Sequence, residues 1–206
     1  MSDSSERVYV VDDEPAVRKA LLRLLRAAGF DAAAFESPKA FLLELETASA
    51  GCAILDVAMP GLDGLALQRE LHARGSTLPI VFLTGRGDIP KSVQAMKRGA
   101  IDFLTKPVDD EVLLAAVRSA LARDRSQRQA REDAADVRRR LASLTLRERE
   151  VLEGVVAGKL NKQIGAELGI TEKTVKVHRG RTMEKMGAGS LAELVHLVER
   201  AGVPGP

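Results

Sequence analysis

Short apolar runs that each end in a polar residue recur through the first half of the chain, and they constrain its fold more than any other feature. Between them lie longer stretches whose apolar residues repeat at helical spacing, such as Val17, Leu21 and Leu24. Strands that alternate with helices are typical of a parallel sheet covered on both faces. We therefore expect a doubly wound α/β domain. Its strands are expected near 7–11, 32–35, 52–55, 79–83 and 101–104, and its helices near 15–28, 38–47, 64–73, 89–98 and 109–123.

Charge divides the chain into two halves. Residues 1–124 carry three more acidic than basic residues, whereas residues 125–206 carry five more basic than acidic ones, and all the aromatic residues lie in the first half. An acidic half joined to a basic half suggests two domains, of which the basic one is a candidate for binding nucleic acid. A simple drift in composition is the alternative.

Two observations exclude other classes of protein. No apolar run approaches the roughly 18 residues that a membrane-spanning helix needs. Cys52 is the only cysteine, which excludes an internal disulfide and a metal site built from cysteines. We expect a cytoplasmic protein with no membrane partner.

The pattern becomes purely helical from residue 143 onward. Residues 145–148 match a capping box, and residues 160–186 read as a helix, a turn with Gly169 and a second helix, which is the helix-turn-helix signature. Few large apolar residues lie between 124 and 142, so an exposed helical linker is expected there. The predicted domains are 1–123, the linker 124–142, and a small all-α domain over 143–206.

The second helix of this motif carries a basic face. Lys173, Lys176 and Arg179 share one side of it, and His178 and Arg181 add further donors. Such a face can contact phosphates and base edges in the major groove of duplex DNA. For the charges alone, a solvated helix face is the alternative. The absence of aromatic residues from 104–206 argues against stacking on single strands.

Polar residues gather where the predicted strands end: Asp12, Asp13, Asp56, Thr84 and Lys106. The carboxyl ends of parallel strands meet at one edge of a sheet, so these side chains are expected to converge. Three carboxylates in one pocket repel one another unless a cation joins them, and oxygen ligands suit Mg²⁺. An ammonium and a hydroxyl beside one carboxylate are what an aspartyl-phosphate requires. Each aspartate taken alone could instead be a helix cap, but the whole set is much harder to reach by chance.

Residues 6–123 resemble the receiver domain of two-component response regulators. The matching motifs are Val-Val-Asp12-Asp13-Glu-Pro, Ile-Leu-Asp56-Val-Ala-Met-Pro60-Gly-Leu-Asp63-Gly64, Phe-Leu-Thr84-Gly and Asp102-Phe103-Leu-Thr-Lys106-Pro107. The resemblance implies a CheY-like sheet with strand order 2-1-3-4-5. It implies that a sensor histidine kinase phosphorylates Asp56, and that Asp12, Asp13, Asp56 and the carbonyl of Ala58 hold Mg²⁺.

The same resemblance implies a switch. Thr84 would be drawn to the phosphoryl group, Phe103 would rotate inward, and Lys106 would contact a phosphoryl oxygen. The resemblance also implies a cis peptide bond between Lys106 and Pro107. Without the resemblance, Phe103 would be assigned to the core. The switch would alter a face for which Val93, Lys97 and Asp102 are the expected members, and so free the DNA-binding domain, dimerise the chain, or both.

Residues 142–203 resemble the LuxR/FixJ-type DNA-binding domain. The matching residues are Leu144-Thr145-Leu-Arg-Glu148-Arg-Glu150-Val-Leu, Gly158, Asn161-Lys-Gln163-Ile164, Ala166, Leu168 and Thr174-Val175-Lys176-Val177-His178-Arg179. The resemblance implies that Lys176, Val177 and Gly180 face bases or the DNA backbone. The expected DNA-binding set is Lys173, Thr174, Lys176, Val177, His178, Arg179, Gly180 and Arg181.

Both halves together resemble a FixJ-type response regulator. The expected function is transcription regulation at promoter DNA, switched by phosphorylation, with a histidine kinase, a second copy of the chain and RNA polymerase as candidate partners. Enzyme activity is not expected beyond slow autodephosphorylation. An aspartyl-phosphate hydrolase of the haloacid dehalogenase type is the alternative, but such enzymes have a second aspartate where Ala58 stands. A receiver that is not phosphorylated is a third reading, which the complete acidic set disfavours.

Overall fold

The computed structural model describes residues 6–45, 50–85 and 89–200 and divides into two compact units, Met1–Gln127 and Arg128–Pro206. The division falls inside one long helix, α5 (Asp110–Ala142).

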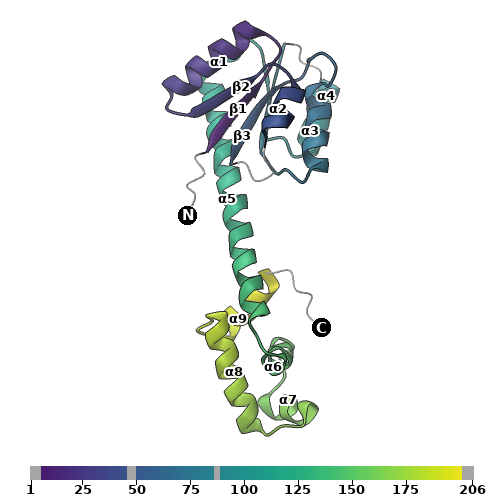
Figure 1. The fold of residues 1–206 in the computed structure, drawn as a ribbon, viewed down its shortest axis with the longest axis vertical. Helices are drawn as coiled ribbons and strands as arrows, with labels where there is room; N and C mark the ends of the chain where they lie inside the picture. Colours follow the sequence, from purple (N-terminus) through teal and green to yellow (C-terminus); the bar gives the residue numbers. More distant parts are fainter. Residues whose placement is uncertain (1–5, 46–49, 86–88, 201–206) are drawn as a thin grey trace. The chain divides into compact units, whose positions relative to one another are not determined.

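The first unit is built on a parallel sheet with the strand order β2-β1-β3-β4-β5 (Figure 1), which confirms the predicted doubly wound fold. The strands are β1 (Arg7–Val11), β2 (Asp31–Phe35), β3 (Gly51–Asp56), β4 (Ile80–Thr84) and β5 (Asp102–Thr105). The helices are α1 (Pro15–Ala27), α2 (Pro38–Glu44), α3 (Gly64–Ala73), α4 (Ile89–Lys97) and the first part of α5. The central strand β3 and its neighbour β4 are buried at every residue, because helices cover both of their faces.

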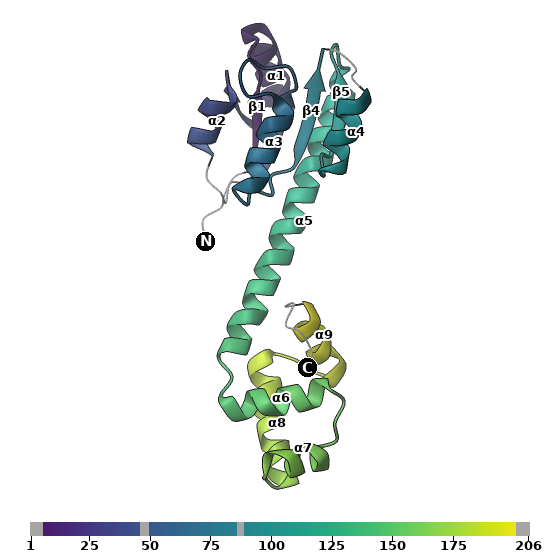
Figure 2. The ribbon, with the colours of Figure 1, turned by 90° about the vertical axis from the view of Figure 1, so that its right-hand side faces the viewer.

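Two hydrophobic cores lie on opposite faces of this sheet. On one face, Val8 and Val10 of β1 pack with Leu21 and Leu25 of α1 and with the apolar residues of α5. On the other face, β1, β3 and β4 pack against α2, α3 and α4, with Phe41 and Phe82 fully buried. Figure 2 shows α2 and α3 together on that second face.

The second unit is helical, as expected, and its elements are α6 (Leu146–Val156), α7 (Asn161–Leu168), α8 (Glu172–Met186) and α9 (Leu191–Arg200). Thr145 and Glu148 form the predicted capping box at the start of α6. Gly169 ends α7 in the left-handed conformation with φ 66°, which glycine adopts without steric cost. The predicted helix-turn-helix is therefore α7, this turn and α8.

The expectation of an exposed linker over 124–142 is corrected at both of its ends. Asp124 is buried in the first unit, where its Oδ2 accepts a hydrogen bond from the Gly51 N–H at 3.0 Å. Val137 is buried in the core of the second unit, beside Leu144 and Val151. Val137 is one of the few apolar residues of the segment, and the sequence did not show that it would pack into the core of the second unit. Across the described part of the chain, no helix is both long and apolar enough to cross a membrane.

Candidate phosphoacceptor site and DNA-binding face

The register of the sheet brings the polar strand ends together. Val11 pairs with Leu55, so the residues that follow them, Asp12 and Asp56, emerge side by side. Asp56 pairs with Leu83, and Thr84 follows directly. Thr84 in turn pairs with Thr105, which precedes Lys106, and the Thr84 carbonyl accepts a hydrogen bond from the Lys106 N–H at 2.7 Å. The predicted convergence of these residues at one edge is thus a direct consequence of strand pairing.

Lys106 forms the electrostatic centre of the site. Its Nζ lies 2.7 Å from Oδ2 of Asp12 and 2.9 Å from Oδ1 of Asp56, and Glu14 lies farther away at 3.6 Å. The side chains of Asp12 and Asp56 are only 2% and 5% exposed. Burial by itself would lower the pKa of Lys106, but its hydrogen bonds to the two aspartates outweigh that effect and raise this pKa above its ordinary value. One ammonium therefore serves two buried carboxylates.

Backbone and side-chain donors hold the two carboxylates in place. The Ala58 N–H donates to Oδ2 of Asp56 at 2.7 Å, and the Glu14 N–H donates to Oδ1 of Asp12 at 2.8 Å. Arg18 donates to the backbone oxygen of Asp12 at 2.8 Å. We did not predict Glu14 or Arg18 as members of the site, because on the sequence both are ordinary polar residues at the start of a helix.

Two of the three aspartates predicted to bind Mg²⁺ are buried at the site, and the third is not. Asp13 is exposed, and nowhere in residues 6–45, 50–85 and 89–200 do three His, Cys, Asp or Glu side chains gather in an arrangement that could hold a metal. Mg²⁺ in proteins is usually held by one or two carboxylates, with water and substrate oxygens completing its shell. Asp12 and Asp56 supply two buried carboxylates against a single ammonium, so this donor set fits Mg²⁺.

Of the two predicted switch residues, Thr84 lies at this edge, whereas Phe103 lies farther back in the sheet, where it pairs with Phe82. Thr84 is buried at the end of β4. Phe103 on β5 is half-buried, and its ring centroid lies 5.9 Å from that of Phe82. The Lys106–Pro107 peptide bond is cis, as the resemblance implied.

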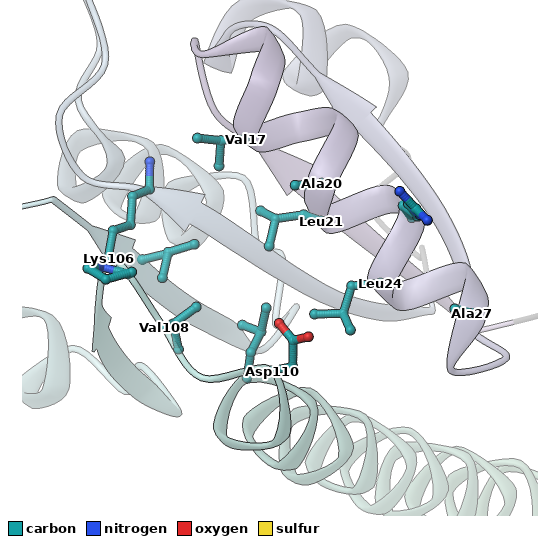
Figure 3. Close-up of a pocket in the computed structure, with 12 residues that line it drawn as sticks. Val17, Ala20, Leu21, Leu24, Ala27, Lys106, Val108 and Asp110 are labelled. Atoms are coloured by element: carbon teal, nitrogen blue, oxygen red, sulfur yellow. The ribbon is translucent and has the colours of Figure 1, made fainter.

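A mostly apolar pocket of about 580 Å³ lies beside the site (Figure 3). In Figure 3, Val17, Leu21 and Leu24 of α1 face Val108 across this hollow, and Lys106 lines one end of it. The pocket was not predicted, because it depends on how α1 and the start of α5 are spaced.

The expected interface residues lie on or next to one side of α4. Val93 leaves 47% of its surface exposed, Met96 leaves 45%, and Lys97 is exposed. Asp102 is half-buried at the start of β5, and its Oδ1 accepts a hydrogen bond from the Phe103 N–H at 2.8 Å. The face thus carries uncovered apolar surface next to a charge.

Helix α8 presents most of the predicted DNA-binding residues to solvent. Lys173, Lys176, Val177, Gly180 and Arg181 are exposed. The other three predicted residues take part in contacts within the domain or are half-buried, and they are Thr174, His178 and Arg179.

The surroundings of those three residues could not be foreseen from the sequence. Arg179 donates to Oδ1 of Asn161 at 3.2 Å and so joins α8 to α7. The hydroxyl groups of Thr174 and Thr171 are 2.8 Å apart at the N-terminus of α8. Nδ1 of His178 is buried and has no hydrogen-bond partner among the described residues, so this nitrogen does not face solvent.

An ion pair between an exposed lysine and a buried glutamate also joins α8 to α6. Lys185 Nζ lies 2.6 Å from Oε2 of Glu148 on α6, and Glu148 is 3% exposed. The hydrogen bonds from Lys185 and from the Thr145 N–H lower the pKa of Glu148 to about 2. Thr182 adds a hydrogen bond from its hydroxyl to the Glu148 carbonyl at 3.3 Å. The sequence predicts Glu148 only as part of a capping box, and the structure adds this second role.

Comparisons with known proteins agree with this geometry in both units. Residues 8–118 match the response regulator receiver domain, and residues 142–198 match the bacterial regulatory proteins of the luxR family. The chain is 45% identical over 196 residues to the transcriptional regulatory protein FixJ of Bradyrhizobium diazoefficiens, covering 95% of this chain and 96% of that one. It is 44% identical to the response regulator protein TodT of Pseudomonas putida, covering 97% of this chain and 88% of TodT.

Solved structures show the same likeness. A structure of the response regulator StyR superposes with a TM-score of 0.85 at 47% identity, covering 95% of this chain and 99% of StyR. Full-length FixJ from B. japonicum superposes with a TM-score of 0.59 at 45% identity, covering 97% and 98% of the two chains. These proteins are regulators, and the hydrolase alternative finds no support among them. The chain therefore belongs to the two-component response regulators that join a receiver domain to a LuxR-family DNA-binding domain, and it is a phosphorylation-dependent transcriptional regulator.

Proposed function

We propose that Asp56 is the phosphoacceptor of this regulator. In the transfer from a phosphohistidine of the sensor kinase, a carboxylate oxygen of Asp56 forms the new O–P bond while the N–P bond of the donor breaks. Lys106 neutralises the charge of the transferred group, and the Thr84 hydroxyl donates to one of its oxygens. The observation that carries the proposal is the contact between Lys106 and a buried Asp56.

Mg²⁺ is the cofactor proposed for this site. Asp12 and Asp56 would hold it, with Asp13 and the carbonyl of Ala58 as the further ligands that the family resemblance implies. When bound, the ion neutralises phosphoryl oxygens during transfer. Slow autodephosphorylation is the only catalytic activity that we propose for the chain.

Phosphorylation is proposed to act through Thr84 and Phe103 on the face that contains Val93 and Lys97. The exposed side chains of Val93 and Met96 support a homodimer interface there, because association would remove this apolar surface from water. Asp102 would lie at the edge of the interface. A dimer would place two α8 helices on half-sites about one DNA turn apart.

The proposed DNA contacts come from α8, with exposed Lys173, Lys176 and Arg181 on phosphates and bases and Val177 on a base edge. Arg179 is half-buried and bonded to Asn161, so we assign it to positioning as well as to phosphate contact. Promoter DNA in the cytoplasm is the proposed target, and RNA polymerase is the proposed partner at that promoter.

Intact mass after incubation with acetyl phosphate tests the phosphoacceptor. We expect the chain to gain one phosphoryl group only when Mg²⁺ is present. Asp56→Asn should gain none. Asp110→Asn, which changes an exposed aspartate at the start of α5, should gain one phosphoryl group as the wild-type chain does. Equal phosphorylation of Asp56→Asn would assign the acceptor elsewhere.

Size-exclusion chromatography with light scattering then tests the dimer. The phosphorylated chain should elute as a dimer, and Val93→Asp should keep its phosphoryl gain while remaining monomeric. Dimers that form equally well in Asp56→Asn, without phosphorylation, would contradict the proposed switch.

A further inference from the structure

A second pocket lies in the first unit, lined by residues outside the phosphoacceptor site. It has a volume of about 510 Å³, and three segments line it: the end of α3 with the turn that leads into β4, the turn between α4 and β5, and α5. These turns precede β4 and β5, whereas Asp56 and Lys106 lie where the parallel strands end, so the two sites are on opposite edges of the sheet. Its volume is within the range of pockets that hold small molecules.

The charged groups that line this pocket are all basic. The two charged groups are Arg98, directly after α4, and Arg123 on α5; the imidazole of His72 at the end of α3 lies with them, and no described residue of the lining carries a carboxylate. Hydroxyl donors from Ser76, Thr77 and Ser119 lie among them. A hollow with guanidinium, imidazole and hydroxyl donors and no acidic group is suited to an anion.

Arg98 provides a second, independent observation. Its Nη1 is buried and has no hydrogen-bond partner among the described residues, which is costly for a charged donor. A basic residue at a helix C-terminus interacts favourably with the helix dipole, and this accounts for the presence of Arg98. It accounts neither for the unsatisfied nitrogen nor for Arg123, which lies in the middle of α5.

We propose that this pocket binds a small phosphorylated molecule. Arg98 and Arg123 would contact its phosphoryl oxygens, and exposed His72 and buried Ser76 would add donors. Guanidinium groups pair in a bidentate manner with phosphates and with carboxylates. Two guanidinium groups together with several hydroxyl donors suit a phosphoryl group better than a halide or a single carboxylate, because a phosphoryl group carries about −1.5 to −2 charge and three acceptor oxygens. The ligand would join α5 to the turns before β4 and β5 and would be a chemical input separate from phosphorylation of Asp56.

The test uses the full chain carrying Asp56→Asn in the presence of EDTA, so that neither phosphorylation nor Mg²⁺ contributes. Inorganic pyrophosphate and AMP are titrated separately at low ionic strength, and binding is followed by the chemical shifts of backbone amides. We expect saturable shifts at residues 76–78 and 98–101, with little change at the Asp56 edge. AMP that binds at least as tightly as pyrophosphate would identify an organic phosphate, and weaker AMP binding would identify a polyphosphate.

Variants separate a specific site from general attraction to positive charge. Arg98→Gln and Arg123→Gln should each weaken binding about tenfold or more, since each removes a charge-assisted hydrogen bond. Arg69→Gln, which removes an exposed arginine of α3 outside the pocket, should leave affinity unchanged. Arg123 is exposed, so its variant tests the proposal even if the Arg98 variant does not fold.

Three results would overturn the proposal. One is the absence of saturable shifts at the pocket with both probes. Another is an affinity that Arg123→Gln leaves unchanged. The third is an equal loss in Arg123→Gln and Arg69→Gln, which would show that only the net charge of the unit matters.

Discussion

Replacing Lys106 by methionine would leave two buried carboxylates without their shared ammonium. The Lys106 Nζ lies 2.7 Å from Asp12 and 2.9 Å from Asp56. At an effective dielectric constant of about 20, each contact corresponds to roughly 6 kcal/mol of Coulomb attraction, most of which offsets the desolvation of the charges. Removing one partner of a buried ion pair costs about 3–5 kcal/mol. The Lys106 side chain keeps 18% of its surface exposed, so we expect the lower end, about 3 kcal/mol.

Urea unfolding in EDTA at neutral pH measures this loss. Tyr9 is the only tyrosine and the chain has no tryptophan, so tyrosine fluorescence reports on the first unit alone. With a slope of about 2 kcal/mol per molar urea, the midpoint of Lys106→Met should fall by roughly 1.5 M. Adding Mg²⁺ should recover part of the loss, because the divalent ion replaces the missing positive charge between the carboxylates.

Two control variants keep this prediction refutable. Lys19→Met removes an exposed lysine of α1 and should leave the midpoint nearly unchanged, and Lys106→Arg should lose less than Lys106→Met because it keeps the charge. If Lys106→Met is as stable as Lys19→Met in EDTA, the two carboxylates do not depend on the ammonium, and the electrostatic account of the site is wrong.

Three further predictions concern single residues. The pKa of Glu148 is lowered from its ordinary value of 4.5 to about 2, so its contribution to stability is present above pH 4.5 and is lost as the pH falls toward 2. In Glu148→Gln the melting temperature, followed by circular dichroism, should therefore fall less steeply between these pH values than in the wild-type chain. An unchanged pH dependence would contradict the ion pair with Lys185. Gly51→Ala should cost more than about 2 kcal/mol in urea unfolding, because its Cβ would clash with the Arg7 carbonyl at a φ of 135°; a smaller loss would show that β1 and β3 can shift apart. A Cβ added at Gly180 of α8 would meet no other atom, so Gly180→Ala should raise stability by up to about 1 kcal/mol. The same substitution should weaken operator binding measured by fluorescence anisotropy, and an unchanged affinity would place the DNA away from this residue.

The fold was predictable because its signals are local. Each buried strand is a run of adjacent apolar residues, and each helix repeats its apolar positions within one or two turns, as Leu21 and Leu25 do on α1. The capping box at Thr145 and Glu148 needs only four residues to be recognised, and the structure confirms it. Val137 was misjudged because a single apolar residue in a polar helix does not show which core it will enter.

The candidate site was predictable in its members and less so in its contacts. Asp12, Asp56, Thr84 and Lys106 were identified because strand ends share one edge of a parallel sheet. The roles of Arg18 and Glu14 could not be foreseen, because they depend on how α1 leaves the edge of the sheet. The bond between Arg179 and Asn161 likewise depends on the packing of α7 against α8.

The sequence by itself determined the kind of protein: a parallel sheet whose strands end in carboxylates, a hydroxyl and an ammonium, followed by a basic helix-turn-helix. These properties are set by residue types at short spacing, where covalent geometry leaves the chain few alternatives. Only the tertiary structure decided that one ammonium serves Asp12 and Asp56, since Asp12 and Lys106 are 94 residues apart and meet through the register of four strands. It also decided that Arg98 and Arg123 line one pocket, because the distance between two helices depends on the packing of the whole core beneath them.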